Sequence, residues 1–133
     1  MDTKKVLLID PDGKLRKELV EGTETPGFEF VEVASAAQAL HVLAKQTIRI
    51  VILNITQADQ EELDLISYIK VNVAGCEVVV LAGIHEIENA IRAVRHGAYL
   101  YLVKPVKSDD MRLVLQKISL RQEKDLKYLE SQT

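Results

Sequence analysis

The sequence has little of what disulfide-stabilised, membrane-spanning or nucleic-acid-binding proteins require. Its 133 residues include one cysteine, Cys76, which cannot form a disulfide within the chain and is interpreted as a small apolar filler. No apolar run approaches the roughly 18 residues of a membrane-spanning helix, and the apolar stretch near the start is too short for a signal peptide. A net charge of −3 disfavours electrostatic attraction to nucleic acid or anionic lipid. We therefore expect a cytoplasmic chain with no membrane association and no direct nucleic-acid contact.

Residues that hold cofactors are also scarce. Gly13 stands alone after the first apolar run, so no glycine-rich loop is available to cradle phosphates. Aromatic residues make up 5% of the chain and form no cluster on which a flavin could stack. The three histidines, His41, His85 and His96, lack the spacing of metal ligands, and no nucleophile–base pair suggests catalysis. These absences argue against an enzyme, and we expect no cofactor.

Short apolar runs alternate with amphipathic segments along most of the chain. Such an alternation is typical of an α/β fold in which helices cover both faces of a parallel sheet. The sequence thus predicts one domain built from five strand–helix repeats, a doubly wound (βα)5 parallel sheet. The predicted strands are Val6–Ile9, Phe28–Val33, Ile48–Leu53, Val78–Ala82 and Tyr99–Val103.

The predicted helices are identified by apolar stripes and by capping residues. The first covers about residues 12–21, and the second begins after the capping residue Ser35. Gly97 is in the usual position of a glycine C-cap and ends the fourth helix. Ser108 and the two acids that follow it cap and charge the start of the fifth helix. The stripes consist of Leu15, Leu19 and Val20; Ala36, Ala39, Leu40 and Leu43; Leu63, Ile66 and Ile69; Ile87, Ala90, Ile91 and Val94; and Met111, Val114, Leu115 and Ile118.

The carboxyl ends of the strands are the expected location of a functional site. In sheets of this kind the working crevice lies at these ends, where the strand order reverses. Asn54 is the most informative residue there. A carboxylate at this point could attack a phosphoryl donor, whereas a neutral amide is a very poor nucleophile and a weaker ligand for a hard cation. The residues expected to converge are Asp10, Pro11, Asp12, Asn54, Ala82, Gly83, Lys104 and Pro105.

The stretch Ala93–Pro105 is the most specific motif of the chain, because Gly-Ala precedes an apolar strand that ends in Lys-Pro. Together with Ile9-Asp10 and the segment 35–40, it resembles the receiver domain of bacterial two-component response regulators. The resemblance extends from Lys4 to about Ile118. It implies a flavodoxin-like receiver fold with the strand order 2-1-3-4-5.

The resemblance implies a phosphorylation pocket, of which this chain keeps only part. The family carries two acids after the first strand that help to bind Mg²⁺, an aspartate after the third strand that accepts the phosphoryl group, and a hydroxyl and a lysine that contact the phosphate. Asp10 matches the first acid, but Pro11 stands at the second, and Asp12 lies one place further on as a first-turn carboxylate. Asn54 stands at the acceptor position, and Ala82 at the position of the switch hydroxyl.

The resemblance also implies roles for three residues that the chain retains. Lys104 matches the phosphate-contacting lysine, Tyr101 the aromatic residue that swings inward on activation, and Pro105 follows a peptide bond that is typically cis. Without an acceptor, Lys104 is interpreted either as an anion-binding lysine or as a structural lysine that pairs with Asp10 and hydrogen-bonds to Asn54. Tyr101 either moves between exposed and buried rotamers or lies on the surface with a hydrated hydroxyl.

The acidic residues near this pocket have competing interpretations. Asp10 is a residual cation ligand, the N-cap of the first helix, or the partner of Lys104. The cluster of Asp59, Glu61 and Glu62 either binds a cation or belongs to a solvated loop and the first turn of the third helix. We expect no metal site, with Asp10 as the only weak candidate, and weak or absent binding of Mg²⁺.

These losses predict a degenerate receiver, a signalling module of a response regulator that acts without aspartyl phosphorylation. Two alternatives stay open: a working receiver that carries an engineered Asp-to-Asn change at Asn54, and a small-ligand-binding domain of flavodoxin-like type. Residues 1–118 would form the receiver. Residues 119–133 would extend the last helix, and they either fray or lead to an absent output domain.

The expected partner is another protein or a fused output domain, and phosphotransfer from a histidine kinase is not expected. In the family, the face formed by the fourth helix, the fifth strand and the fifth helix mediates dimerisation and output contacts. The resemblance therefore also allows a homodimer through this face. Its residues here are Ile91, Arg92, Arg95, Tyr101, Lys107 and Arg112.

Overall fold

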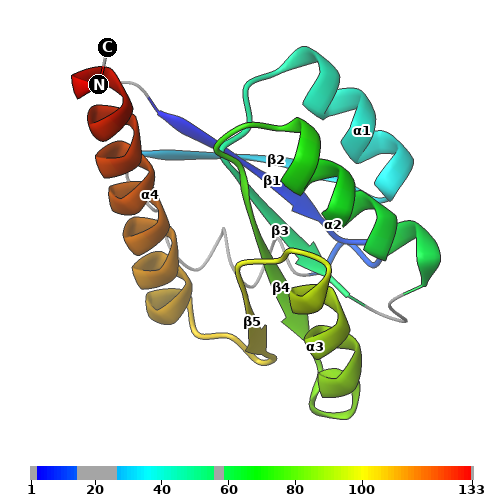
Figure 1. The fold of residues 1–133 in the computed structure, drawn as a ribbon. Helices are drawn as coiled ribbons and strands as arrows, with labels where there is room; N and C mark the ends of the chain where they lie inside the picture. The colour runs from blue at the N-terminus through cyan, green and yellow to red at the C-terminus, as the bar shows by residue number, and fades with distance from the viewer. Residues whose placement is uncertain (1–2, 15–26, 56–58, 133) are drawn as a thin grey trace.

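The computed structural model describes residues 3–14, 27–55 and 59–132, and its centre is a five-stranded parallel sheet (Figure 1). The strands pair in the order β2-β1-β3-β4-β5. This arrangement confirms the predicted fold class and the predicted order 2-1-3-4-5. The strands are β1 Lys4–Ile9, β2 Phe28–Val33, β3 Ile50–Asn54, β4 Glu77–Ala82 and β5 Leu100–Val103.

Helices cover both faces of the sheet, as the alternating pattern predicts (Figure 1). The predicted helix at 12–21 lies for the most part outside the described residues. The other four predicted helices are present, and a short 3₁₀ turn precedes α3. The elements are α1 Ala36–Lys45, α2 Gln60–Asn72, η2 Ile84–Glu86, α3 Ile87–Arg95 and α4 Ser108–Ser131. No helix in these parts of the chain is both long and apolar enough to cross a membrane.

The alternation of side chains along each strand divides the core into two layers. One layer joins Leu7, Val51 and Val80 to the buried residues of α1, α2 and α3. The other layer joins Leu8 and Ile52 to the buried side of α4. Because β1, β3 and β4 are buried on both faces, they are almost continuously apolar in sequence.

Two of the predicted helix caps are confirmed. The Ser35 side chain accepts a hydrogen bond from the main-chain N–H of Gln38 at 3.2 Å. After α3, Gly97 adopts a φ of +120°, and the N–H of Ala98 donates to the carbonyl of Ala93 at 3.1 Å. This 6→1 bond is the Schellman arrangement, which favours glycine because other residues rarely adopt a positive φ.

The predicted cap at Ser108 is wrong, although its acidic neighbours are placed as predicted. Ser108 is already the first helical residue, and the extended N-cap position belongs to Lys107, whose side chain makes no capping bond. A serine inside the first turn cannot accept a hydrogen bond as an N-cap residue does. Asp109 and Asp110 lie in the first turn, where the helix dipole favours negative charge.

The predicted apolar stripe of α3 coincides only in part with its buried face. Ala90 and Ala93 are its buried residues, whereas Ile91 and Val94 are 39% and 38% exposed. Small side chains let the helix approach the sheet closely, and the larger ones then lie at the sides of the contact. Leu40 on α1 is exposed for the same reason, since Ala39 is the residue that faces the core.

Candidate functional site

Three residues that are distant in sequence meet at the carboxyl ends of three strands. Asp10 follows β1, Asn54 ends β3 and Lys104 follows β5. The Asn54 amide Nδ2 donates to Asp10 Oδ1 at 3.1 Å, and Lys104 Nζ donates to Asn54 Oδ1 at 2.8 Å. The amide therefore connects the carboxylate to the ammonium group through two hydrogen bonds.

This arrangement is electrically balanced inside a buried site. Asp10 and Asn54 are 2% and 4% exposed, so each polar atom needs a partner in place of water. An amide offers a donor at one end and an acceptor at the other, and both are used here. One negative and one positive side chain are thus joined by a neutral group, with no excess charge among the three.

Asp10 also stabilises the turn that follows β1. The main-chain N–H of Asp12 donates to Asp10 Oδ1 at 3.3 Å, and the N–H of Gly13 donates to the Asp10 carbonyl at 3.3 Å. Pro11 and Asp12 are exposed. In the hydrogen bonds that the structure describes, this loop thus offers Asp10 the main-chain N–H of Asp12 and not a second carboxylate.

Ala82 and Gly83 close the neighbouring side of the site. Ala82 is fully buried, and its carbonyl accepts from the N–H of Lys104 at 2.8 Å. The Gly83 N–H donates to Glu86 Oε1 at 2.9 Å, so Glu86 fixes the loop that follows β4. We did not predict this contact. The sequence does carry a signal for it, because Glu86 stands three residues after Gly83, the N-cap of the helical turn, as in a capping box.

Lys104 and Tyr101 border the same edge of the sheet. The Lys104–Pro105 peptide bond is cis. Tyr101 in β5 is half-buried and packs against the core layer that contains Ala82. Movement of the ring between rotamers stays a prediction.

The acidic residues near this edge start a helix. Asp59 is the N-cap of α2, where its Oδ1 accepts from the N–H of Glu62 at 2.9 Å. Glu61 and Glu62 lie in the first turn of α2, where the helix dipole favours acids. Across the described ranges, no group of three or more His, Cys, Asp or Glu side chains could hold a metal ion.

The residues of the predicted interaction face surround the edge strand β5. Arg92, Arg95 and Ile91 on α3 are exposed, as is Lys107 before α4. Arg112 on α4 is half-buried, and its Nη1 lies 3.7 Å from Asp109 Oδ1. Because α3 and α4 lie on opposite faces of the sheet, β5 forms the middle of this surface (Figure 1).

The single thiol is buried and stays protonated at neutral pH. Cys76 is 4% exposed, just before β4. Burial raises the pKa of its thiol to about 12, with a further increase from the Glu77 carboxylate and an opposing effect from Arg49. A thiol with this pKa holds its proton at neutral pH and is a poor nucleophile.

Known proteins share this fold and sequence pattern. A profile of the response regulator receiver domain family matches residues 6–116. The response regulator protein FleR of Pseudomonas aeruginosa is 35% identical over 101 residues, which cover 76% of this chain and 21% of FleR. The alginate biosynthesis transcriptional regulatory protein AlgB of Pseudomonas putida is 28% identical over 113 residues, 85% of this chain and 25% of AlgB. The chain thus spans about a fifth to a quarter of the length of these relatives.

Solved structures give the same result. NtrX from Brucella abortus, crystallised in complex with ADP, superposes with a TM-score of 0.83 at 26% identity, over 95% of this chain and 29% of NtrX. A receiver domain protein from Clostridium thermocellum superposes with a TM-score of 0.76 at 26% identity, over 90% of this chain and 97% of that protein.

Proposed function

This chain belongs to the response regulator receiver domain family of two-component signal transduction, and we propose that it is a receiver that acts without aspartyl phosphorylation. The observation that carries the proposal is the Asn54 amide, which ends β3 and forms hydrogen bonds to Asp10 and to Lys104. Both polar ends of this amide have partners within the chain, and the charges of the two partners cancel. The site is thus complete without a phosphoryl group.

The first argument concerns the nucleophile. Transfer of a phosphoryl group to this position would need a carboxylate oxygen to attack phosphorus, and an amide oxygen lacks the negative charge that makes this attack favourable. Ala82 adds no hydroxyl to contact a phosphate, and Lys104 donates to Asn54. The groups that would attack, orient and stabilise a phosphate are therefore missing or engaged elsewhere.

The second argument concerns the cation. A receiver with a carboxylate at residue 54 would hold two negative groups about 3 Å apart, which strongly favours a bound cation. Here the Asn54 Nδ2 donates to Asp10 Oδ1 at 3.1 Å, so the same space contains an attractive contact. Pro11 has no side-chain oxygen to offer. We therefore propose that Mg²⁺ binds weakly or not at all.

The proposed output is protein contact. Relatives such as AlgB are about four times the length that this chain covers, and AlgB is described as a transcriptional regulatory protein. By analogy, the partner of this receiver is a fused output domain or another protein. The surface around β5 is the proposed contact region, either for that partner or for a second copy. Its exposed arginines on α3 favour an acidic counterpart.

Intact-mass spectrometry tests the proposal directly. The protein is incubated with acetyl phosphate and Mg²⁺, and a phosphoryl group would add about 80 Da. We expect no increase. A gain of about 80 Da in the unmodified chain would overturn the proposal, and an Asp59→Ala variant would show whether that residue had become the acceptor.

The Asn54→Asp variant is the matched control in the same experiment. If it gains a phosphoryl group readily, the pocket of a working receiver is intact and the engineered-substitution alternative is favoured. If it stays unlabelled, Pro11 and Ala82 have removed the chemistry as well. Thermal-shift measurements with nucleotides and cyclic nucleotides test the remaining alternative, a small-ligand-binding domain.

A further inference from the structure

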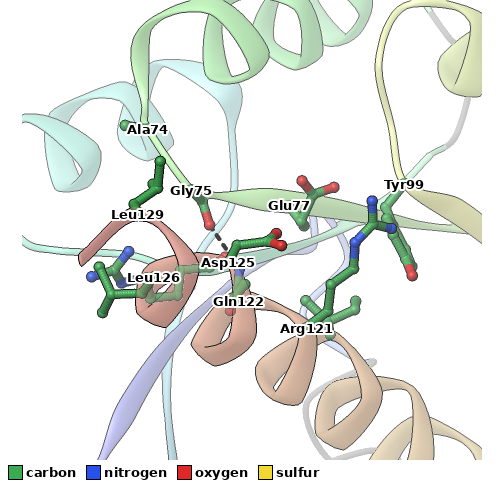
Figure 2. A pocket seen from close by; sticks show the side chains of 11 residues that line it. Ala74, Gly75, Glu77, Tyr99, Arg121, Gln122, Asp125, Leu126 and Leu129 are labelled. Carbon is green, nitrogen blue, oxygen red and sulfur yellow. Dashed lines mark hydrogen bonds between the residues drawn. The ribbon is translucent and has the colours of Figure 1, made fainter. Parts of the chain in front are cut away.

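The second half of α4 crosses the amino ends of the strands, at the opposite edge of the sheet from Asp10, Asn54 and Lys104. At this crossing, Gln122 Nε2 donates to the carbonyl of Arg49 at 2.8 Å and to the carbonyl of Gly75 at 2.7 Å. Figure 2 shows the Gln122 side chain beneath the Gly75 carbonyl. Arg49 leads into β3, and Gly75 lies in the loop before β4. One side chain of α4 thus bonds to main-chain atoms at the start of two strands.

The residues on either side of Gln122 contact the two strands that flank β3 and β4. The Arg121 guanidinium lies 5.6 Å from the centre of the ring of Tyr99, the residue just before β5. Figure 2 shows the Arg121 side chain extending toward Tyr99. Glu123 Oε1 is 2.9 Å from Nζ of Lys4, the first residue of β1, and the same ammonium group donates to Ser119. These three consecutive side chains therefore contact the starts of four neighbouring strands. Arg121 reaches β5, Gln122 reaches β4 and β3, and Glu123 reaches β1, which is also the order of these strands in the sheet.

Beyond Glu123 the helix has less support. Leu126 and Leu129 are 50% and 62% exposed, and they line a cavity of about 260 Å³ together with Ala74 and Gly75 (Figure 2). The helix still continues to Ser131. Among the hydrogen bonds and ion pairs between described residues, those of residues 121–123 are the last that α4 makes to the strands or to the segments leading into them.

We propose that Arg121, Gln122 and Glu123 form a clamp that fixes the direction in which α4 leaves the domain, with Gln122 as its central positioning residue. We call these three residues the amino-edge clamp. The Gln122 contacts are the most constraining, because both N–H groups of one amide are directed at two fixed carbonyls. The other two contacts are exposed and are screened by solvent. This inference rests on the proposed function only for its biological role: where an output domain follows α4, the clamp would set the angle at which that domain is attached.

The clamp is tested by replacing its donor with an acceptor. Gln122→Glu keeps a similar shape and helix propensity, but it turns a carboxylate oxygen toward two carbonyls. Gln116→Glu is the matched control, since Gln116 is an exposed residue of the same helix and the charge change is the same. Spin labels at Lys45→Cys and Lys127→Cys report the position of the helix end by electron–electron dipolar spectroscopy. The buried Cys76 does not compete for the label.

We expect one narrow distance distribution in the parent protein and in Gln116→Glu, and a broad one in Gln122→Glu. Hydrogen exchange gives a second readout: amides of residues 124–131 should exchange roughly 10- to 30-fold faster without the two bonds, while β1, β3 and β4 keep their protection. Gln122→Ala removes the donors without adding charge and covers the case in which Gln122→Glu fails to fold. A broad distribution in the parent, or unchanged distributions and exchange in both Gln122 variants, would overturn the clamp. No phosphoryl donor or metal is present, so this result is independent of the mass measurement.

Discussion

Replacing Asn54 by aspartate tests whether the Asn54 amide stabilises the Asp10 carboxylate in the way that a bound cation would. The substitution puts a carboxylate oxygen where Nδ2 now donates to Asp10 Oδ1 at 3.1 Å. Two unit charges at this separation repel by about 5 kcal/mol at an effective dielectric constant of about 20. Lys104, at 2.8 Å from the other end of residue 54, attracts the new carboxylate by a similar amount, so the net cost comes from the lost hydrogen bond to Asp10 and from burying a second carboxylate. We therefore expect Asn54→Asp to lower the free energy of unfolding by roughly 1–3 kcal/mol at pH 7 without divalent cations.

The pH dependence of this loss has a defined sign. Two adjacent carboxylates raise the pKa of at least one of them above the unfolded value of about 4. The folded variant then binds a proton more tightly than the unfolded chain does. The loss is consequently small below pH 4, increases as the pH rises through the raised folded pKa, and is complete at neutral pH.

Urea unfolding with and without Mg²⁺ measures both effects. Magnesium should recover stability in Asn54→Asp, since a cation can sit between the two carboxylates, and should leave the parent protein unchanged. The reasoning is refuted if Asn54→Asp is as stable as the parent at pH 7 in the absence of Mg²⁺. It is also refuted if Mg²⁺ stabilises the parent by the same amount as the variant.

Two further predictions concern the scaffold. Folding raises the pKa of the Cys76 thiol from its ordinary value of 9.0 to about 12, so the folded chain favours the neutral thiol. The stability that the folded chain gains from this neutral thiol is fully present below about pH 9 and is lost between pH 9 and 12. Urea unfolding should therefore show a stability decrease of roughly 1 kcal/mol from pH 8 to 10 that is absent in Cys76→Ala. Gly97→Ala should cost more than Gly27→Ala, by at least about 1 kcal/mol in the same assay. Both glycines have a positive φ, but only at Gly97 would a Cβ lie 3.2 Å from Lys70 atoms. Equal losses for the two glycine variants would contradict this packing argument.

The sheet could be predicted from the sequence because the signal for each strand lies within the residues of that strand. Strands such as β3 and β4 are buried on both faces, so nearly every residue in them is apolar and the runs stand out. The inward face of α3 could not be predicted in the same way. There the sheet contact is made by Ala90 and Ala93, and a search for large apolar residues favours the exposed Ile91 and Val94 instead.

The two edges of the sheet differ in what a sequence can reveal. At the carboxyl edge the functional groups are side chains, so the types of Asp10, Asn54 and Lys104 already indicate what they could do together. At the amino edge Gln122 bonds to the carbonyls of Arg49 and Gly75, and every residue type has such a carbonyl. The segment from 119 to 133 is mostly polar and charged, and we predicted only that it frays or leads onward. Tertiary structure alone identifies its partners.

Under the proposed function, charge balance accounts for the presence of uncharged residues at both position 11 and position 54. With an acid at residue 11 and another at residue 54, the site would hold three carboxylates and one lysine, and a divalent cation would be needed to compensate them. Proline at 11 and asparagine at 54 each remove one negative charge, which leaves Asp10 opposite Lys104 with a neutral amide between them. Either substitution alone would leave an excess charge of −1 in the site without metal. Both together give a pocket whose hydrogen bonds are satisfied from within the chain. Restoring an acid at residue 54 alone should therefore produce a site that is strained without Mg²⁺, and restoring acids at both residues should make the dependence on Mg²⁺ stronger.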